Sequence, residues 1–286
     1  MGLVDLGSVL HPAFKGGYGV GSFNVIDSNF VEAVIAAAEN KNSPIIVSLA
    51  EVHFRCADIR SIAATTRALA RESSVPVVLN LDHGLSLETI IKAVRYGFTS
   101  VMFDGSRLGY EDNVRSTREI AKICKAAGVS VEAELGAVGG AEAGDIGGTA
   151  DPEFFTDPDQ AGDFVAATGI DALAVAIGNV HGKYRGEPFL DFDRLQKIRE
   201  KSGVPLVLHG GSGISDDDFR RAVNCGIAKV NFYTEMARKA LIESEKYISG
   251  LKSYYGTFDD LNLVIRESVR QSVEERISVF GSEGKA

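Results

Sequence analysis

Short apolar runs rich in β-forming residues alternate with helical segments along most of this chain, and this alternation constrains its fold more than any other feature. Strands that alternate with helices form a parallel sheet through right-handed crossovers. Eight units favour closure into a (β/α)8 TIM barrel, and a barrel of about 250 residues accommodates the chain as a single domain over residues 1–286. The predicted strands are Tyr18–Asn24, Pro44–Leu49, Val75–His83, Ser100–Asp104, Ser130–Gly136, Ala172–Gly178, Pro205–Gly210 and Lys229–Thr234.

The intervening helices have recognisable start and stop signals. One begins with Asp157 as N-cap and Pro158 at the first helical position, and ends before Gly169. Gly128, Gly169, Gly203 and Gly226 each stand between a helix and the next strand, as left-handed C-terminal caps do. Two helices, at about 235–248 and 258–279, are predicted as extra C-terminal helices of the same domain.

Composition excludes some partners. Thirty Lys and Arg against 39 Asp and Glu give a net charge of −9, which argues against nucleic acid or an anionic membrane as the main partner. The chain has no 18-residue apolar run and no recognisable targeting segment, so we expect a cytoplasmic protein.

Three of the five histidines follow different predicted strands: His83, His181 and His209. The carboxyl ends of TIM-barrel strands meet at one face, where the chemistry lies. Three imidazoles with an open position form a known type of catalytic zinc site. His11 and His53 lack this placement and are interpreted as surface or local packing residues.

Asp82 directly precedes His83, although neighbouring strand residues point to opposite sides. We therefore expect the chain to leave regular pleating at this rim, so that both side chains reach one site, and Gly84 to let it turn away.

Two segments indicate an anion site: HGGSG (209–213) after the seventh strand and NFYT (231–234) on the eighth. Glycine-rich turns expose backbone N–H groups, and these loops often hold phosphate in such barrels. A metal beside a phosphate site predicts stabilisation of an enediolate, as in aldol cleavage of a ketose phosphate. The small-residue loop 139–149 is interpreted either as a mobile lid or as a connector.

Ordered motifs along essentially the whole chain resemble the class II, metal-dependent fructose-bisphosphate and tagatose-bisphosphate aldolase family, and most closely a less characterised aldolase-like branch. They are GVGSFNV (19–25), LDHG (81–84), VEAELGAVGG (131–140), DALAVAIGNVHGKY (171–184), PLVLHGGSGI (205–214) and KVNFYTE (229–235).

The resemblance implies a (β/α)8 barrel that assembles as a homodimer or homotetramer and acts on a small-molecule sugar phosphate. It makes His83, His181 and His209 ligands of one catalytic Zn²⁺. Asp104 and Glu134 match a second position for a divalent or monovalent cation. Asp82 matches the residue that exchanges a proton with the aldehyde-derived oxygen, and Glu142 the one that exchanges the proton on the ketose carbon. The residues that match positions holding dihydroxyacetone phosphate are Gly182, Gly210, Gly211, Ser212, Asn231, Phe232, Tyr233 and Thr234.

The expected function is reversible aldol cleavage of a ketose phosphate or bisphosphate to dihydroxyacetone phosphate and an aldehyde, such as glyceraldehyde 3-phosphate or a related aldose. The loop 48–58 does not match the pattern that grips the second phosphate, and this leaves the aldehyde open. The alternatives are a metal enzyme for a non-bisphosphate sugar, a zinc hydrolase, and a catalytically silent binding barrel. A Schiff-base aldolase would use Lys183 or Lys229, but Lys229 is expected at the start of its strand, at the wrong barrel end.

Overall fold

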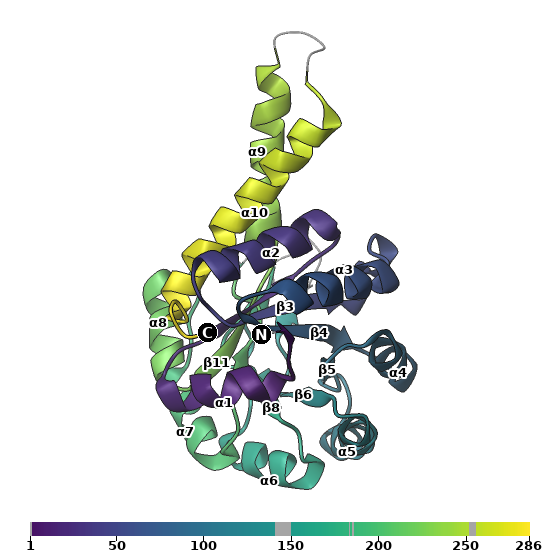
Figure 1. Ribbon diagram of the computed structural model, residues 1–286. Helices are drawn as coiled ribbons and strands as arrows, with labels where there is room; N and C mark the ends of the chain where they lie inside the picture. The colour runs from purple at the N-terminus through teal and green to yellow at the C-terminus, as the bar shows by residue number, and fades with distance from the viewer. Residues whose placement is uncertain (1, 141–149, 183, 185, 252–255) are drawn as a thin grey trace.

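The computed structural model describes residues 2–140, 150–182, 184, 186–251 and 256–286, and its body is a closed barrel of eight parallel strands (Figure 1). Around the barrel the strands run β4, β3, β2, β11, β10, β8, β6 and β5, and β5 pairs again with β4. The prediction of a TIM barrel is therefore confirmed, with strand boundaries shifted by at most three residues. The barrel strands are β2 (Val20–Asn24), β3 (Ile45–Ala50), β4 (Pro76–Gly84), β5 (Ser100–Phe103), β6 (Ser130–Leu135), β8 (Ala172–Val175), β10 (Leu206–Leu208) and β11 (Ile227–Phe232).

Helices surround the barrel in the order that the alternation predicts (Figure 1). They are α2 (Ser28–Asn40), α3 (Ile59–Glu72), α4 (Leu87–Tyr96), α5 (Tyr110–Ala126), α6 (Pro158–Thr168), α7 (Phe192–Ser202) and α8 (Asp216–Asn224). The predicted caps of α6 are confirmed: the Asp157 side chain accepts hydrogen bonds from the backbone N–H groups of residues 159 and 160, and Gly169 is left-handed with φ 70°. Two short 3-10 helices, η1 (Glu51–Arg55) and η2 (Pro152–Phe154), lie in loops that follow strands.

One helix, α1 (Leu6–Gly16), was not expected from the sequence. Its apolar side chains Leu6, Val9 and Leu10 join the buried cluster inside the barrel, which includes Val20 and Ile46. The helix therefore closes the amino-terminal end of the barrel with apolar packing. Two further short strands lie outside the barrel order: β1 (Gly2–Leu3) pairs with β4, and β7 (Gly139–Gly140) pairs with β9 (Val180–His181).

The barrel interior becomes polar towards the carboxyl ends of the strands. Ser22 and Ser48 are hydrogen-bonded at 2.7 Å, and Asn80 Nδ2 donates to Ser48 Oγ at 3.1 Å. Glu132 on β6 and Lys229 on β11 are also fully buried. Because buried polar groups need partners, this side of the barrel is the place where a site can be built.

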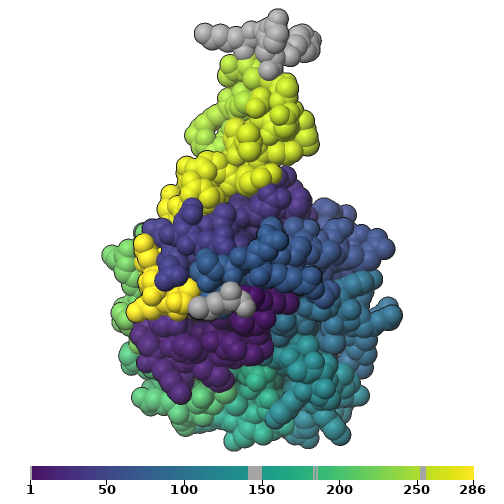
Figure 2. Space-filling view, viewed as in Figure 1, coloured from purple at the N-terminus to yellow at the C-terminus, as the bar shows by residue number. Residues whose placement is uncertain are grey.

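Two C-terminal helices, α9 (Thr234–Gly250) and α10 (Phe258–Phe280), confirm the predicted tail and project as a hairpin beyond the barrel (Figures 1 and 2). The prediction of a strand through Thr234 was wrong by two residues, because the chain turns at Tyr233 and Thr234 is the first residue of α9. None of the described helices is both long and apolar enough to cross a membrane.

Candidate functional site

The carboxyl end of β4 departs from regular strand geometry, as the Asp82–His83 pair predicts. His83 has a φ of 45°, in the left-handed region that non-glycine residues rarely adopt. The pairing of β4 with β5 shifts register between Leu81 and Gly84, so the strand is irregular there. This irregularity interrupts the alternation of side chains, which lets both Asp82 and His83 face one site. Strained backbone of this kind is concentrated at functional sites.

The three predicted ligands are brought together from different parts of the chain. His83 ends β4, His181 lies in β9, and His209 follows β10. Each offers one ring nitrogen, and these three atoms lie within 4.8 Å of one another. The ring centroids are 4.6 to 5.9 Å apart, with the rings edge to face.

Carboxylates set the tautomers of two of these rings. His83 Nδ1 lies 2.8 Å from Asp104 Oδ2, and His209 Nε2 lies 2.8 Å from Glu132 Oε1. When the two rings are neutral, as they must be to bind a metal, each has one N–H, and these carboxylates accept it. The nitrogens that face each other at 2.8 Å, His83 Nε2 and His209 Nδ1, then both present lone pairs. A cation between them removes this repulsion, so the donor set fits a divalent metal.

Burial favours the neutral form of the third ring. It lowers the pKa of His181 well below its ordinary value, with the neighbouring His83 and His209 acting in the same direction. A metal ligand must be deprotonated at the nitrogen that binds. The environment of His181 therefore supports ligation at neutral pH.

A buried ion pair lies beneath His209. Lys229 Nζ donates to Glu132 Oε2 at 2.6 Å, and both side chains are fully buried. Burial alone would raise the pKa of Glu132, but Lys229 and His209 hold it below its usual range. The placement of Lys229 at the start of its strand was wrong: β11 begins at Ile227, so Lys229 lies inside the barrel and contacts Glu132, the partner of His209.

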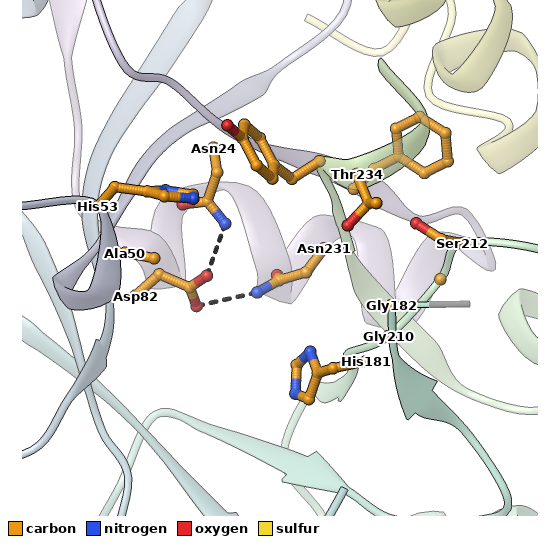
Figure 3. A pocket seen from close by; sticks show the side chains of 13 residues that line it. Asn24, Ala50, His53, Asp82, His181, Gly182, Gly210, Ser212, Asn231 and Thr234 are labelled. Atoms are coloured by element: carbon orange, nitrogen blue, oxygen red, sulfur yellow. Dashed lines mark hydrogen bonds between the residues drawn. The ribbon is translucent and has the colours of Figure 1, made fainter. Parts of the chain in front are cut away.

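Asp82 is held between two amides. Asn24 Nδ2 donates to its Oδ2 at 2.7 Å, and Asn231 Nδ2 donates to its Oδ1 at 2.9 Å (Figure 3). The carboxyl is fully buried, which by itself would raise its pKa. In the metal-free protein, positive charge on His83 and His209, the ammonium group of Lys229 and the hydrogen bond from Asn24 outweigh burial and lower the pKa of Asp82. Asp82 is therefore a fixed, ionised carboxylate.

A second group of possible metal donors overlaps the first. His83, Asp104 and Glu134 also offer ligand atoms within 4.8 Å of one another. Burial and the charge of Asp104 raise the pKa of Glu134 to about 7. Its Oε2 is buried and has no hydrogen-bond partner among the residues that the structure describes. The predicted residues of the second cation position thus do lie together.

One cavity joins Asp82 and His181 to all eight residues that the resemblance assigns to the donor substrate. Those residues are Gly182, Gly210, Gly211, Ser212, Asn231, Phe232, Tyr233 and Thr234. Gly210 has a φ of 66°, and a Cβ there would lie 2.2 Å from the carbonyl oxygen of Val180, so only glycine fits this turn. The cavity therefore combines the carboxylate of Asp82, one of the three histidines that could hold a metal, and a glycine turn.

Sequence reasoning missed several residues of this cavity. His53, interpreted as a packing residue, lines it together with Asn24 and Ala50. Asn24 and Ala50 end strands β2 and β3, so the same strand-end rule could have found them. His53 lies in η1, beyond a strand end, where no local pattern shows its direction. Glu142 and Lys183 lie outside the described residues.

Known proteins resemble this chain over nearly its whole length. The family model of class II fructose-bisphosphate aldolase matches residues 4–285. The fructose-bisphosphate aldolase of Geobacillus stearothermophilus is 39% identical, with 100% of this chain and 99% of that protein covered. The crystal structure of the YdjI aldolase from Escherichia coli K12 superposes with a TM-score of 0.89 at 37% identity, covering 99% of each chain. A putative fructose-1,6-bisphosphate aldolase from Coccidioides immitis gives 0.84 at 33% identity, with 97% and 96% covered. The chain therefore belongs to the class II fructose-bisphosphate aldolase family, and it is an aldolase, an enzyme of the lyase class.

Proposed function

We propose that this aldolase reversibly cleaves a ketose phosphate to dihydroxyacetone phosphate and an aldehyde. The observation that carries the proposal is the shared cavity, in which the ionised Asp82 lies with His181 of the metal group and the glycine turn at residues 210–212. A catalyst for this reaction needs a proton carrier, a stabiliser for a developing enediolate and a phosphate cradle.

Zn²⁺ is the proposed catalytic ion, with His83, His181 and His209 as its protein ligands. Three imidazoles suit zinc and leave a position for substrate oxygen. A bound zinc ion would polarise the ketone oxygen and offset the negative charge that develops on it. Glu132 and Lys229 would hold His209 in its orientation during turnover. A hydrogen bond to the ring nitrogen that does not bind the metal fixes the orientation of a metal-binding histidine. We propose Asp104 and Glu134 as ligands of a second cation.

The protein residues would move two protons. In the cleavage direction Asp82 takes the proton from the hydroxyl group that becomes the aldehyde oxygen. The electron pair of the broken carbon–carbon bond moves to the donor carbon. Glu142 then returns a proton to that carbon, which gives dihydroxyacetone phosphate. Because its pKa is lowered, Asp82 starts as a base, and it acts as the acid in the condensation direction.

The phosphate of the donor would bind at the glycine turn. Gly210, Gly211 and Ser212 line the cavity together with Asn231 and Thr234, and their backbone N–H groups would donate to the phosphate. Neutral N–H donors hold a phosphate despite the net charge of −9, because their effect is local.

We also propose that the enzyme is a homodimer or homotetramer in the cytoplasm. The projecting hairpin exposes apolar side chains that a monomer would leave in water: Leu241, Ile248, Leu251, Phe258 and Leu263, which are 40 to 75% exposed. Exposed apolar patches of this kind often form subunit contacts. Light scattering tests the assembly, and a monomer at micromolar concentration would contradict it.

The function is tested by incubating the zinc-loaded enzyme with dihydroxyacetone phosphate and a panel of aldehydes, and by identifying the products. We expect new ketose phosphates, loss of product formation with a chelator, and recovery with Zn²⁺. Chelator-resistant activity that borohydride destroys in the presence of substrate would instead indicate a Schiff base. Hydrolysis of a substrate without carbon–carbon bond formation would indicate a zinc hydrolase.

A further inference from the structure

His53 is a buried histidine that the proposed reaction does not use. Its side chain is 3% exposed, and neither ring nitrogen has a hydrogen-bond partner among the residues that the structure describes. Buried polar atoms are nearly always satisfied, so an orphan that lines a cavity calls for an explanation. A bound ligand would supply the missing partner.

The position of His53 indicates which part of a substrate would reach it. Figure 3 shows His53 and Ala50 on the same side of the cavity as Asp82, whereas Gly182, Gly210 and Ser212 lie across from them. In the proposed function, on which this inference rests, the donor phosphate occupies that opposite side. The part of the substrate that extends past Asp82 is then the aldehyde.

The ring of His53 is fixed in place by its neighbour. Its centroid lies 4.4 Å from that of Tyr233, and the two rings are tilted by 53°. Burial lowers the pKa of His53 and outweighs the opposing charge of Asp82, while Arg55 acts in the same direction as burial. A neutral imidazole offers one donor and one acceptor, which is the pair of interactions that a hydroxyl group makes.

The charges around His53 do not suit a phosphate. None of the described residues that line the cavity is Lys or Arg, and the carboxylate of Asp82 would repel a dianion. Arg55 belongs to the same 3-10 helix, but its side chain is exposed and does not line the cavity. A second phosphate would therefore lie between an anion and a neutral ring.

We propose that His53 is a specificity-determining residue that hydrogen-bonds to a hydroxyl group of an unphosphorylated hydroxyaldehyde. A site built to hydrogen-bond a hydroxyl group discriminates strongly against an analogue that lacks it, because the polar atoms are then left unpaired. The acceptor class is thus a free aldose, whereas a bisphosphate aldolase takes a phosphorylated aldehyde.

The test compares three acceptors of equal chain length with dihydroxyacetone phosphate and the zinc-loaded enzyme: erythrose, butanal and erythrose 4-phosphate. The expected order of kcat/KM places erythrose first. His53→Phe keeps a ring against Tyr233 but removes both nitrogens, so it should lower kcat/KM for erythrose by about 10- to 100-fold and change that for butanal by less than about twofold. His53→Gln, which restores a donor and an acceptor, should recover part of the erythrose activity.

Equal losses for erythrose and butanal in His53→Phe would overturn the specificity role and leave a packing role. A wild-type preference for erythrose 4-phosphate over erythrose would overturn the acceptor class. Solvent deuterium exchange into dihydroxyacetone phosphate, measured on the wild type without aldehyde, separates these failures from failure of the proposed function. If the wild type exchanges deuterium into dihydroxyacetone phosphate but either acceptor result contradicts the expectation, only the inference about His53 is refuted. No exchange and no condensation with any aldehyde refutes both.

Discussion

Two kinds of buried histidine face the same site and differ in their surroundings. His83 and His209 each have a ring nitrogen against a carboxylate, and their other nitrogens point at one another. His53 is as deeply buried as His83, yet both of its nitrogens lack a partner among the described residues. The first arrangement fixes tautomers before a ligand arrives, as a permanent metal requires. The second leaves the hydrogen-bonding groups open, as a transient substrate requires.

The largest expected difference between the two kinds is in metal content. His209→Ala should lose the bound zinc and reduce aldol turnover by at least about 10³-fold, because the metal stabilises several kcal/mol of developing charge. His53→Ala is the matched control and should keep a full equivalent of zinc after dialysis. Metal analysis together with circular dichroism checks both variants. Equal zinc content in the two folded variants would break the comparison.

The ion pair under His209 gives the next largest effect. Lys229→Met leaves the Glu132 carboxylate buried without its cation, and should lower the free energy of unfolding by about 3–5 kcal/mol. The double variant Glu132→Gln/Lys229→Met should lose less free energy of unfolding than Lys229→Met alone. It should also bind zinc about 10- to 100-fold more weakly than the wild type. Denaturant unfolding and chelator competition measure the two effects. Unchanged zinc affinity in the double variant would show that Glu132 does not support the ligand.

Glu134 should give the metal-free enzyme a pH dependence of stability. Its pKa rises from 4.5 in the unfolded chain to about 7 in the native state. The native state therefore binds the proton more tightly, and stability falls as pH rises through this window, by up to about 3 kcal/mol. Glu134→Gln should abolish this slope between about pH 4.5 and 7. An identical slope in the variant would assign the dependence to another group.

The smallest effect is expected at His11, which belongs neither to the proposed metal ligands nor, like His53, to the cavity. His11 is exposed on α1, at the opposite end of the barrel. His11→Ala should change the free energy of unfolding by less than about 0.5 kcal/mol and leave zinc content and turnover as in the wild type. A loss of zinc in this variant would show that metal content reports general damage and not ligation.

The fold and the convergence of the three histidines could be predicted because their signals are local. Strand and helix periodicity, caps and glycines lie within a few residues, and the barrel rule then places every strand end on one face. His83, His181 and His209 follow from that rule alone. The departure from pleating at Asp82–His83 was also predicted, and the φ of 45° at His83 confirms it.

The role of His53 could not be predicted because it depends on a distant residue. The ring is held against Tyr233, 180 positions further along the chain, and η1 carries no periodic signal that fixes its direction. Lys229 was misplaced for a different reason: a boundary error of two residues moved it from the barrel interior to the rim. The burial of a charged residue depends on such small shifts, which propensity does not resolve.

The central claim is that Asp82 moves the proton on the aldehyde oxygen while the histidine group holds the metal, and Asp82→Ala tests it most directly. The measurement compares, on one zinc-loaded preparation, aldol turnover with deuterium exchange into dihydroxyacetone phosphate. We predict full zinc content, exchange within a few-fold of the wild type, and turnover lower by about 10²- to 10⁴-fold, because only the proton on the aldehyde side is lost. Near-normal turnover in Asp82→Ala would contradict the account.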